Sequence, residues 1–214
     1  MSKASRAQVG KVAISRGAFR GRMVRFLEHE GLRPTPSRVR EAVFSMLADL
    51  AEEGYGFLDA CAGSGVMGFT AAGCGFAPVV MVDGNKAVLD ELEKNQKQLE
   101  VSVDLVYGSA LQVGKLPMAA GPWICYADPP FDNRKFHPKM TARLVAHDAF
   151  APGSLNVAEH EQPFTVAEGL TLLKQKKYGR TLISVYRKEP PAEDVAPVDA
   201  ASAAPEEDIP ADAS

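Results

Sequence analysis

The stretch Asp128-Pro129-Pro130-Phe131 follows an apolar run at residues 123–127 and combines a carboxylate, two prolines and an aromatic ring. Two prolines stiffen the backbone and remove two amide donors, so nearby carbonyl oxygens have no local partner. The Asp128 carboxylate and the Pro129 carbonyl then form a pair of acceptors that suits the exocyclic amine of a nucleobase, and Phe131 offers a flat face for stacking. The stretch therefore predicts a catalytic site formed by Asp128, Pro129, Pro130 and Phe131.

A second motif lies in segment 59–68, DACAGSGVMG, where Gly63, Gly65 and Gly68 have the spacing G-x-G-x-x-G. Glycines at this spacing let a ligand approach the backbone closely, as in nicotinamide-binding loops. Asp59, four residues ahead of the first glycine, would repel a pyrophosphate but suits a ligand with an ammonium or sulfonium group. S-adenosylmethionine carries both groups and no phosphate. The loop thus favours this methyl donor over a nicotinamide cofactor, although Asp83 could hold the ribose hydroxyls of either ligand.

Alternating strand and helix patterns place both motifs at strand ends. Apolar runs predict strands at 55–60, 78–82, 101–107, 123–127 and near 155–158, and a closing hairpin at 170–178 and 181–186 around Gly179. Helices are expected from about residue 66, after a cap at Asn85, and around 139–147. This order predicts an α/β fold with a doubly wound, mostly parallel sheet and an antiparallel terminal strand, whose ligands bind at the carboxyl ends of the strands.

The N-terminal 32 residues predict a basic β-hairpin, and its arginines are candidate phosphate contacts for a nucleic acid: Arg16, Arg20, Arg22 and Arg25. In Arg33-Pro34-Thr35-Pro36, Thr35 suits an N-cap and Pro36 a first helical residue. The helix that follows has one apolar face, formed by Val39, Ala42, Val43, Met46, Leu47 and Leu50. A second basic group lies near the closing hairpin and consists of Lys174, Lys176, Lys177 and Arg180.

The composition of the 214 residues, 46% hydrophobic and 24% charged, indicates one globular domain at 33–187 between the hairpin segment and a tail. Residues 1–40 carry a local charge of +8 and residues 188–214 one of −7, which suggests a polyanion contact through the basic end. The tail at 188–214 is rich in Ala, Pro and acids and is expected to be disordered.

The cysteines and histidines argue against a metal site or a disulfide framework. Three cysteines are an odd number without C-x-x-C spacing, and the histidines show no ligand spacing. His29, His137, His147 and His160 are expected to be surface or capping residues. Neither a signal sequence nor a membrane span is evident, so we expect a cytoplasmic protein without membrane contact.

Together these stretches resemble the class I amino-methyltransferases with a (D/N)-P-P-(Y/F) motif, and more narrowly the bacterial 16S ribosomal RNA guanine-N2 methyltransferases. The narrower resemblance rests on residues 17–22, 33–41, 59–68, 128–131 and 177–181 with Tyr186. It implies S-adenosylmethionine as cofactor, no metal, a monomer, and ribosomal RNA or a small-subunit assembly intermediate as partner. The implied cofactor-binding residues are Arg33, Thr35, Asp59, Ala62, Gly63, Ser64, Gly65, Asp83, Ser109 and Ala110.

The chain departs from this family pattern at Thr70, at Ser109 and after Asp83, where the family usually has charged residues. Two alternatives remain open at this level. The tetrad at 128–131 does not distinguish the amine of guanine from that of adenine, so an adenine-N6 methyltransferase on DNA or RNA fits as well. A non-catalytic RNA-binding protein on the same fold is the second alternative.

Overall fold

The structure is a computed structural model and describes residues 8–28, 34–130 and 133–191. The predictions for Arg33, for Phe131, for the ends of the hairpin segment and for the tail beyond residue 191 fall outside these ranges.

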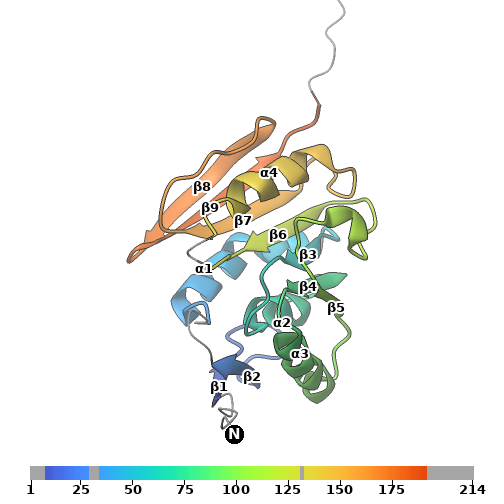
Figure 1. Cartoon of the computed structure of the whole chain (residues 1–214), viewed down its shortest axis with the longest axis vertical. Coiled ribbons are helices and arrows are strands. Elements are labelled where there is room, and N and C mark those ends of the chain that lie inside the picture. Colours follow the sequence, from blue (N-terminus) through green and yellow to red (C-terminus); the bar gives the residue numbers. More distant parts are fainter. Residues whose placement is uncertain (1–7, 29–33, 131–132, 192–214) are drawn as a thin grey trace, which may run out of the picture.

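A seven-stranded sheet forms the centre of the fold, in the order β5-β4-β3-β6-β7-β9-β8 (Figure 1). The first five strands in this order are parallel, and β9 is antiparallel to both of its neighbours. The strands are β3 (Gly56–Asp59), β4 (Val79–Asp83), β5 (Asp104–Tyr107), β6 (Trp123–Ala127), β7 (Leu155–His160), β8 (Leu170–Tyr178) and β9 (Thr181–Lys188). This confirms the doubly wound sheet with an antiparallel terminal strand.

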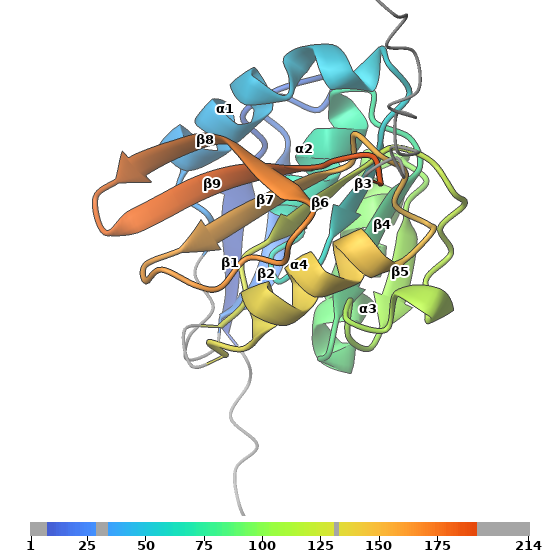
Figure 2. The same ribbon diagram turned by 90° about the horizontal axis from the view of Figure 1, so that it is seen from above.

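Helices cover both faces of this sheet (Figure 2). On one face lie α1 (Ser37–Met46), α2 (Val66–Gly73) and α3 (Lys86–Leu99), and on the other lie α4 (Phe136–Ala146) and the short turn at Val113–Lys115. Neighbouring strand residues alternate between the two cores: Phe57 packs on the side of α1, and Leu58 packs on the side of α4. Because both faces are covered, the central strands are continuous apolar runs rather than alternating ones.

The start of α1 differs from the expected one by a residue. Pro36, not Thr35, occupies the N-cap position, and no side chain caps the helix. The Thr35 hydroxyl instead lies 3.3 Å from the hydroxyl oxygen of Tyr126 in the interior, so it does not reach the helix amides. The helix also ends at Met46, and a 3₁₀ turn at Ala48–Ala51 follows. The expected cap of α3 is confirmed, since the Asn85 side chain accepts from the Ala87 amide at 3.0 Å.

The N-terminal hairpin is part of the globular body. Its strands β1 (Gln8–Ala13) and β2 (Met23–Glu28) pair antiparallel, and β2 packs against α3 (Figure 1). Val24 of β2 is buried in the core shared with α3. The Asn95 side chain of α3 accepts from the Arg25 amide at 2.9 Å and donates to the Arg25 carbonyl at 2.7 Å. This paired contact fixes β2 against α3.

The substitution Asn95→Ala is expected to lower the free energy of unfolding by roughly 1–3 kcal/mol, because it leaves a partly buried amide and carbonyl of β2 without partners. Urea denaturation measures the effect. Gln96→Ala, one residue along the same helix, is the control and should change the stability little. Equal stabilities of the two variants would mean that the Asn95 hydrogen bonds do not stabilise the docked hairpin.

Candidate active site

Four carboxyl groups meet where the parallel strands end. Asp59 ends β3, Asp83 ends β4, Asp128 follows β6, and Glu159 is the penultimate residue of β7. Because the strands run parallel, these ends lie at one edge of the sheet, and β3 and β6 flank the point where the strand order reverses. Ligands of doubly wound folds bind at such a point. The sheet thus brings the two motifs of segments 59–68 and 128–131 together.

The glycine loop between β3 and α2 is held by Asp83 of the neighbouring strand. Asp83 accepts from the Gly63 amide at 2.9 Å with one carboxylate oxygen and from the Asn85 amide at 2.8 Å with the other. Gly65 has a φ of 75°, and a Cβ there would lie 2.4 Å from a methyl carbon of Leu92. Only glycine fits this position. Each Asp83 oxygen keeps a lone pair for a ligand hydroxyl, so the predicted ribose contact stays compatible with the geometry.

Asp59, the last residue of β3, holds the other end of the same loop. Its carboxylate is 1% exposed and accepts from the Gly68 amide in the first turn of α2 at 3.0 Å. Burial raises the pKa of Asp59 to about 7, against the lowering effect of the bond from Gly68. A cationic ligand at the loop would favour the ionised carboxylate. Its predicted donor contact stays a prediction.

The other predicted cofactor residues are distributed around this loop. Ala62 and Ser64 are buried within it, and Ser64 Oγ accepts from the Val66 amide at 3.4 Å. Ser109 is exposed in the turn after β5, next to Gly108, whose amide donates to the Asp83 carbonyl at 3.0 Å. The Ala110 side chain packs in the core beneath α4. The Thr35 hydroxyl contacts Tyr126, and its role in donor binding stays untested.

A pocket of about 460 Å³ opens beside Asp128. Asp128, Pro129 and Pro130 line one side of it, and Glu159, His160 and Phe164 contribute to the rest. The Phe164 ring stacks on the His137 ring with centroids 4.7 Å apart, which gives the pocket an aromatic wall. A volume of this order is typical of small-molecule sites.

Acidic side chains without basic partners among the described residues gather between the glycine loop and the pocket. Burial raises the pKa of Asp128 well above its usual range, and the charges of Glu159 and Asp59 raise it further. Burial also raises the pKa of Glu159, while a hydrogen bond from Tyr126 works in the opposite direction. Within the described ranges, no basic side chain forms an ion pair with any of the four carboxyls. The site therefore suits a ligand with cationic groups or hydrogen-bond donors.

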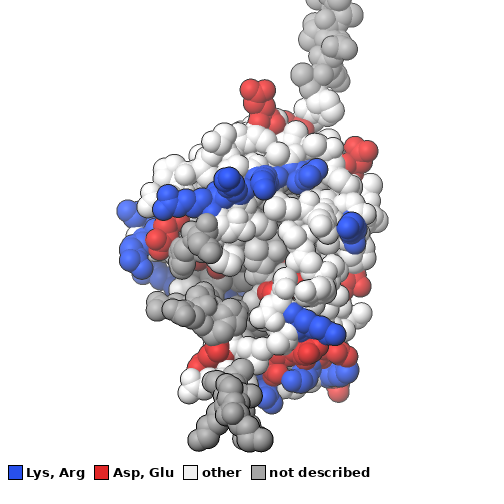
Figure 3. Space-filling model, viewed as in Figure 1, with Lys and Arg blue, Asp and Glu red and all other residues white. Residues whose placement is uncertain are grey.

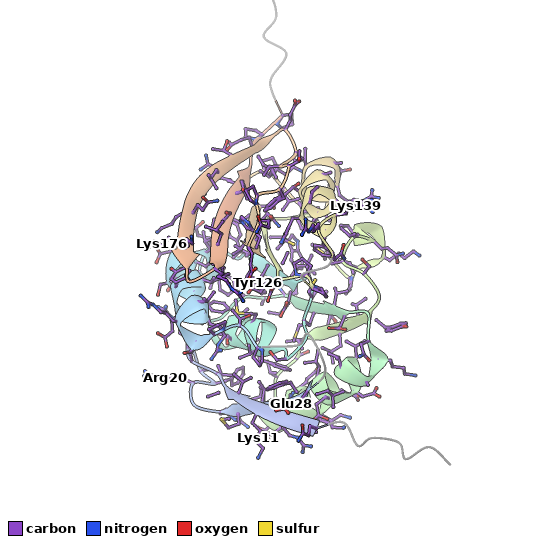
Figure 4. The ribbon with its side chains drawn as sticks, turned by 60° about the vertical axis from the view of Figure 1, so that its left-hand side comes forward. Lys11, Arg20, Glu28, Tyr126, Lys139 and Lys176 are labelled. Carbon is purple, nitrogen blue, oxygen red and sulfur yellow. The ribbon has the colours of Figure 1, made fainter. Side chains whose placement is uncertain are left out.

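Glu159 and Tyr126 are site residues that the sequence analysis missed. The Tyr126 hydroxyl donates to Glu159 Oε2 at 2.5 Å and lies near the centre of the molecule in Figure 4. The only signal in the sequence is the pair Glu159-His160 at the end of a predicted strand. That strand becomes part of the site because β7 pairs with β6, and the strand order cannot be read from the chain.

Two histidines were wrongly expected at the surface. His137 and His160 are buried, line the pocket and contact Phe164. His137 Nε2 lies 3.0 Å from the Glu159 carbonyl, and burial lowers the pKa of this imidazole to about 4, so the neutral ring donates to the carbonyl. His147 does form the expected local cap, accepting from the Ala149 amide, and His29 lies outside the residues that the structure describes.

Three of the four hairpin arginines have structural partners. Arg25 forms an ion pair with Glu91 at 3.0 Å, Arg22 donates to the Gln98 and Leu99 carbonyls, and Arg16 donates to Ser45 at 2.8 Å. Arg20 is exposed, and the structure shows no side-chain partner for it among the residues it describes. Of the four, Arg20 is therefore the best placed for an external phosphate. Contact with RNA stays a prediction for all of them.

A second group of basic residues lies on β8, at one edge of the sheet. Lys174, Lys176 and Lys177 are exposed on β8, the edge strand. Lys176 and Arg20 lie on the same side of the molecule, with α1 between them (Figure 4). In Figure 3 a row of basic side chains crosses the surface over β8 and α4.

Comparison with known proteins shows the family of the chain. The family model described as "Conserved hypothetical protein 95" matches residues 12–187. The ribosomal RNA small subunit methyltransferase D of Haemophilus influenzae is 32% identical over 184 residues, which cover 83% of this chain and 94% of that protein. The chain belongs to this methyltransferase family.

Other members of the family agree in sequence and in structure. The ribosomal RNA small subunit methyltransferase D of Escherichia coli strain K12 is 29% identical over 193 residues, covering 88% of this chain and 96% of that protein. The solved structure of yhhF from Escherichia coli superposes with a TM-score of 0.71 at 29% identity and covers 84% of this chain and 99% of that one. The class I methyltransferase fold is thereby confirmed.

Among the residues that the structure describes, no group of three or more His, Cys, Asp or Glu side chains is arranged to hold a metal ion. No helix in the same ranges is long and apolar enough to span a membrane.

The raised pKa of Asp59 predicts a pH-dependent stability. The pKa of Asp59 in the folded protein, about 7, exceeds the ordinary value of 3.8. The contribution of Asp59 to the free energy of unfolding is therefore greatest below about pH 4 and is lost as the pH rises through 7. Asp59→Asn keeps a neutral group at every pH. Its stability relative to the unaltered protein should therefore rise by roughly 3 kcal/mol between pH 4 and pH 8.

Urea unfolding at a series of pH values measures this difference. Asp90→Asn, at an exposed position of α3, controls for the loss of one negative charge. A difference between Asp59→Asn and the unaltered protein that stays constant with pH would contradict the buried, protonated carboxyl.

Proposed function

We propose that this chain transfers the methyl group of S-adenosylmethionine to the exocyclic N2 amine of a guanine in 16S ribosomal RNA. The observation that carries the proposal is the position of Asp128 and Pro129, which line a pocket at the end of β6, the strand paired with β3, after which the glycine loop begins. Relatives named ribosomal RNA small subunit methyltransferase D support the choice of substrate. The protein would act as a monomer in the cytoplasm. Its substrate would be either free RNA or a small-subunit assembly intermediate.

On the donor side, the glycine loop with Asp59, Asp83 and Ser109 would hold S-adenosylmethionine. The loop gives a close approach to the backbone at Gly63 and Gly65, and both acids brace it through backbone amides. The donor supplies an electrophilic methyl group on its sulfonium. The protein then needs mainly to align the two reactants, because proximity and orientation account for most of such a rate enhancement.

On the acceptor side, the Asp128 carboxylate and the Pro129 carbonyl would accept the two hydrogens of the amine. Its lone pair is delocalised into the ring, so it attacks well only when the nitrogen becomes pyramidal. When the nitrogen–carbon bond forms and the sulfur–carbon bond breaks, the nitrogen acquires a positive charge and releases a proton. An Asp128 carboxylate that accepts a hydrogen bond from the amine is placed to receive that proton.

The product identifies the function. The purified protein is incubated with labelled S-adenosylmethionine and either 16S RNA or small-subunit particles from cells that lack this activity, and the RNA is digested to nucleosides. N2-methylguanosine is the expected product. N6-methyladenosine would replace the proposal by the adenine alternative, and donor binding without any methylated product would favour a non-catalytic RNA-binding protein.

The substitution Asp128→Ala should lower the turnover number about a hundredfold or more, since it removes an interaction that is strongest in the transition state. Asp128→Asn should be milder, because its amide oxygen still accepts one hydrogen bond. Methyl transfer is followed by nucleoside mass spectrometry, and donor binding by calorimetry. Full turnover of folded Asp128→Ala, with donor affinity unchanged, would remove Asp128 from the reaction.

The substitution Arg20→Gln tests the hairpin as an RNA contact without disturbing its docking. If Arg20 neutralises a phosphate, the slope of log affinity against log salt should fall by about 0.7–0.9. Filter binding of 16S RNA at several salt concentrations measures the slope. Arg187→Gln on β9 carries the same change of charge, away from the hairpin, and should leave the slope unaltered. Identical slopes for both variants would mean that Arg20 faces solvent and contacts no phosphate.

A further inference from the structure

Glu159 contributes to the pocket that holds Asp128, but neither sequence motif contains it. Its side chain is partly open to this pocket. One carboxylate oxygen accepts from Tyr126 at 2.5 Å. The described residues offer no further hydrogen bond to this carboxyl, so its second oxygen is available to a ligand in the pocket.

Both the side chain and the backbone of Glu159 are held in place. Tyr126 fixes the carboxyl, and the Tyr126 hydroxyl in turn lies 3.3 Å from Thr35 Oγ1. The Arg40 guanidinium donates to the Thr35 carbonyl and, at 2.9 Å, to the Ala13 carbonyl of β1. On the backbone side, His137 Nε2 donates to the Glu159 carbonyl at 3.0 Å. A group held by buried hydrogen bonds on both sides is pre-organised for recognition rather than free to adapt.

The hydrogen bond from Tyr126 favours an acceptor at this position, in opposition to the burial that raises the pKa of Glu159. Tyr126 has one hydroxyl proton and gives it to Glu159 Oε2, which stabilises the carboxylate form. Burial raises the pKa of Tyr126 well above its usual range, so the phenol keeps this proton. An ionised carboxylate accepts hydrogen bonds and cannot donate them.

Guanine and adenine differ at the ring nitrogen next to their exocyclic amine. In guanine, N1 carries a hydrogen and is a donor beside the N2 amine, whereas in adenine N1 has a lone pair and is an acceptor beside the N6 amine. A carboxylate next to the amine-binding Asp128 attracts the first arrangement and repels the second. With adenine in the pocket, both the Glu159 carboxylate and N1 of the base would be acceptors without a donor. Leaving buried polar groups unpaired in this way rejects an analogue strongly.

We propose that Glu159 selects guanine by accepting a hydrogen bond from N1–H of the target base, while Asp128 and the Pro129 carbonyl hold its N2 amine. This assignment rests on the proposed function and adds the residue that distinguishes the two exocyclic amines. Tyr126 is the positioning residue that keeps the Glu159 carboxylate in place. Phe164 and His137 form the aromatic wall beside the base.

The test compares Glu159→Gln with the unaltered enzyme on RNA that carries guanine or 2-aminopurine at the methylated nucleotide, mapped beforehand in the product. 2-Aminopurine keeps the 2-amine but has no hydrogen on N1. The RNA is used free or assembled with small-subunit proteins, whichever the unaltered enzyme methylates. The unaltered enzyme should prefer guanine by about ten- to hundredfold. The carboxamide of Glu159→Gln can donate to a bare N1, so this preference should fall about tenfold or reverse.

Glu168→Gln is the matched control, since Glu168 is exposed and lies outside the pocket. It should keep the guanine preference. Tyr126→Phe should reduce the preference less than Glu159→Gln does, with little change in donor affinity. Melting temperature and calorimetric donor binding show that each variant is folded.

The outcomes separate the two proposals. If the unaltered enzyme forms N2-methylguanosine and folded Glu159→Gln keeps the full preference for guanine over 2-aminopurine, the role of Glu159 is refuted and the proposed function stands. If Glu159→Gln does not fold, Tyr126→Phe decides, because an unchanged preference in that variant also refutes the assignment. If the unaltered enzyme forms no N2-methylguanosine at all, both proposals fail together.

Discussion

The crowding of carboxyl groups at one edge of the parallel sheet is the constraint on which the rest of the structure depends. Asp59, Asp83, Asp128 and Glu159 all reach this edge because their strands run in the same direction. Burial raises the pKa values of Asp59, Asp128 and Glu159, and repulsion from neighbouring carboxyl groups raises those of Asp59 and Asp128 further. Buried carboxyl groups placed this close together lower the stability of the folded protein. Active sites commonly retain such unfavourable arrangements.

The fold limits this cost by giving the acids backbone amides and hydroxyl groups as partners instead of basic side chains. Asp59 and Asp83 accept from amides of the glycine loop, and Glu159 accepts from Tyr126. These bonds stabilise the acids and at the same time fix the conformation of the loop and of the pocket wall. A bound cationic ligand would remove part of the remaining repulsion, so ligand binding and the stability of this edge are coupled.

The sequence predicted those features that depend on short stretches of chain. The strand at residues 123–127, the Asn85 cap and the glycine loop each follow from local residue patterns, and the structure confirms them. Glu159 and Tyr126 were missed because their contact requires the pairing of β6 with β7, which local patterns do not encode. Thr35 was assigned to the wrong local partner for the same reason, since Tyr126 lies 91 residues away in the chain.

The basic residues of the hairpin and of α1 connect the hairpin to the rest of the protein. The Arg22 side chain binds carbonyls in the last turn of α3, and the Arg25 side chain pairs with Glu91 in the first half of that helix, so both side chains already have partners within the protein. The Arg40 guanidinium links the end of β1 to Thr35, and through Tyr126 to Glu159. A continuous series of hydrogen bonds therefore runs from the hairpin to the pocket. Because these bonds are partly buried, a displacement of the hairpin would act on groups that set the position of Glu159.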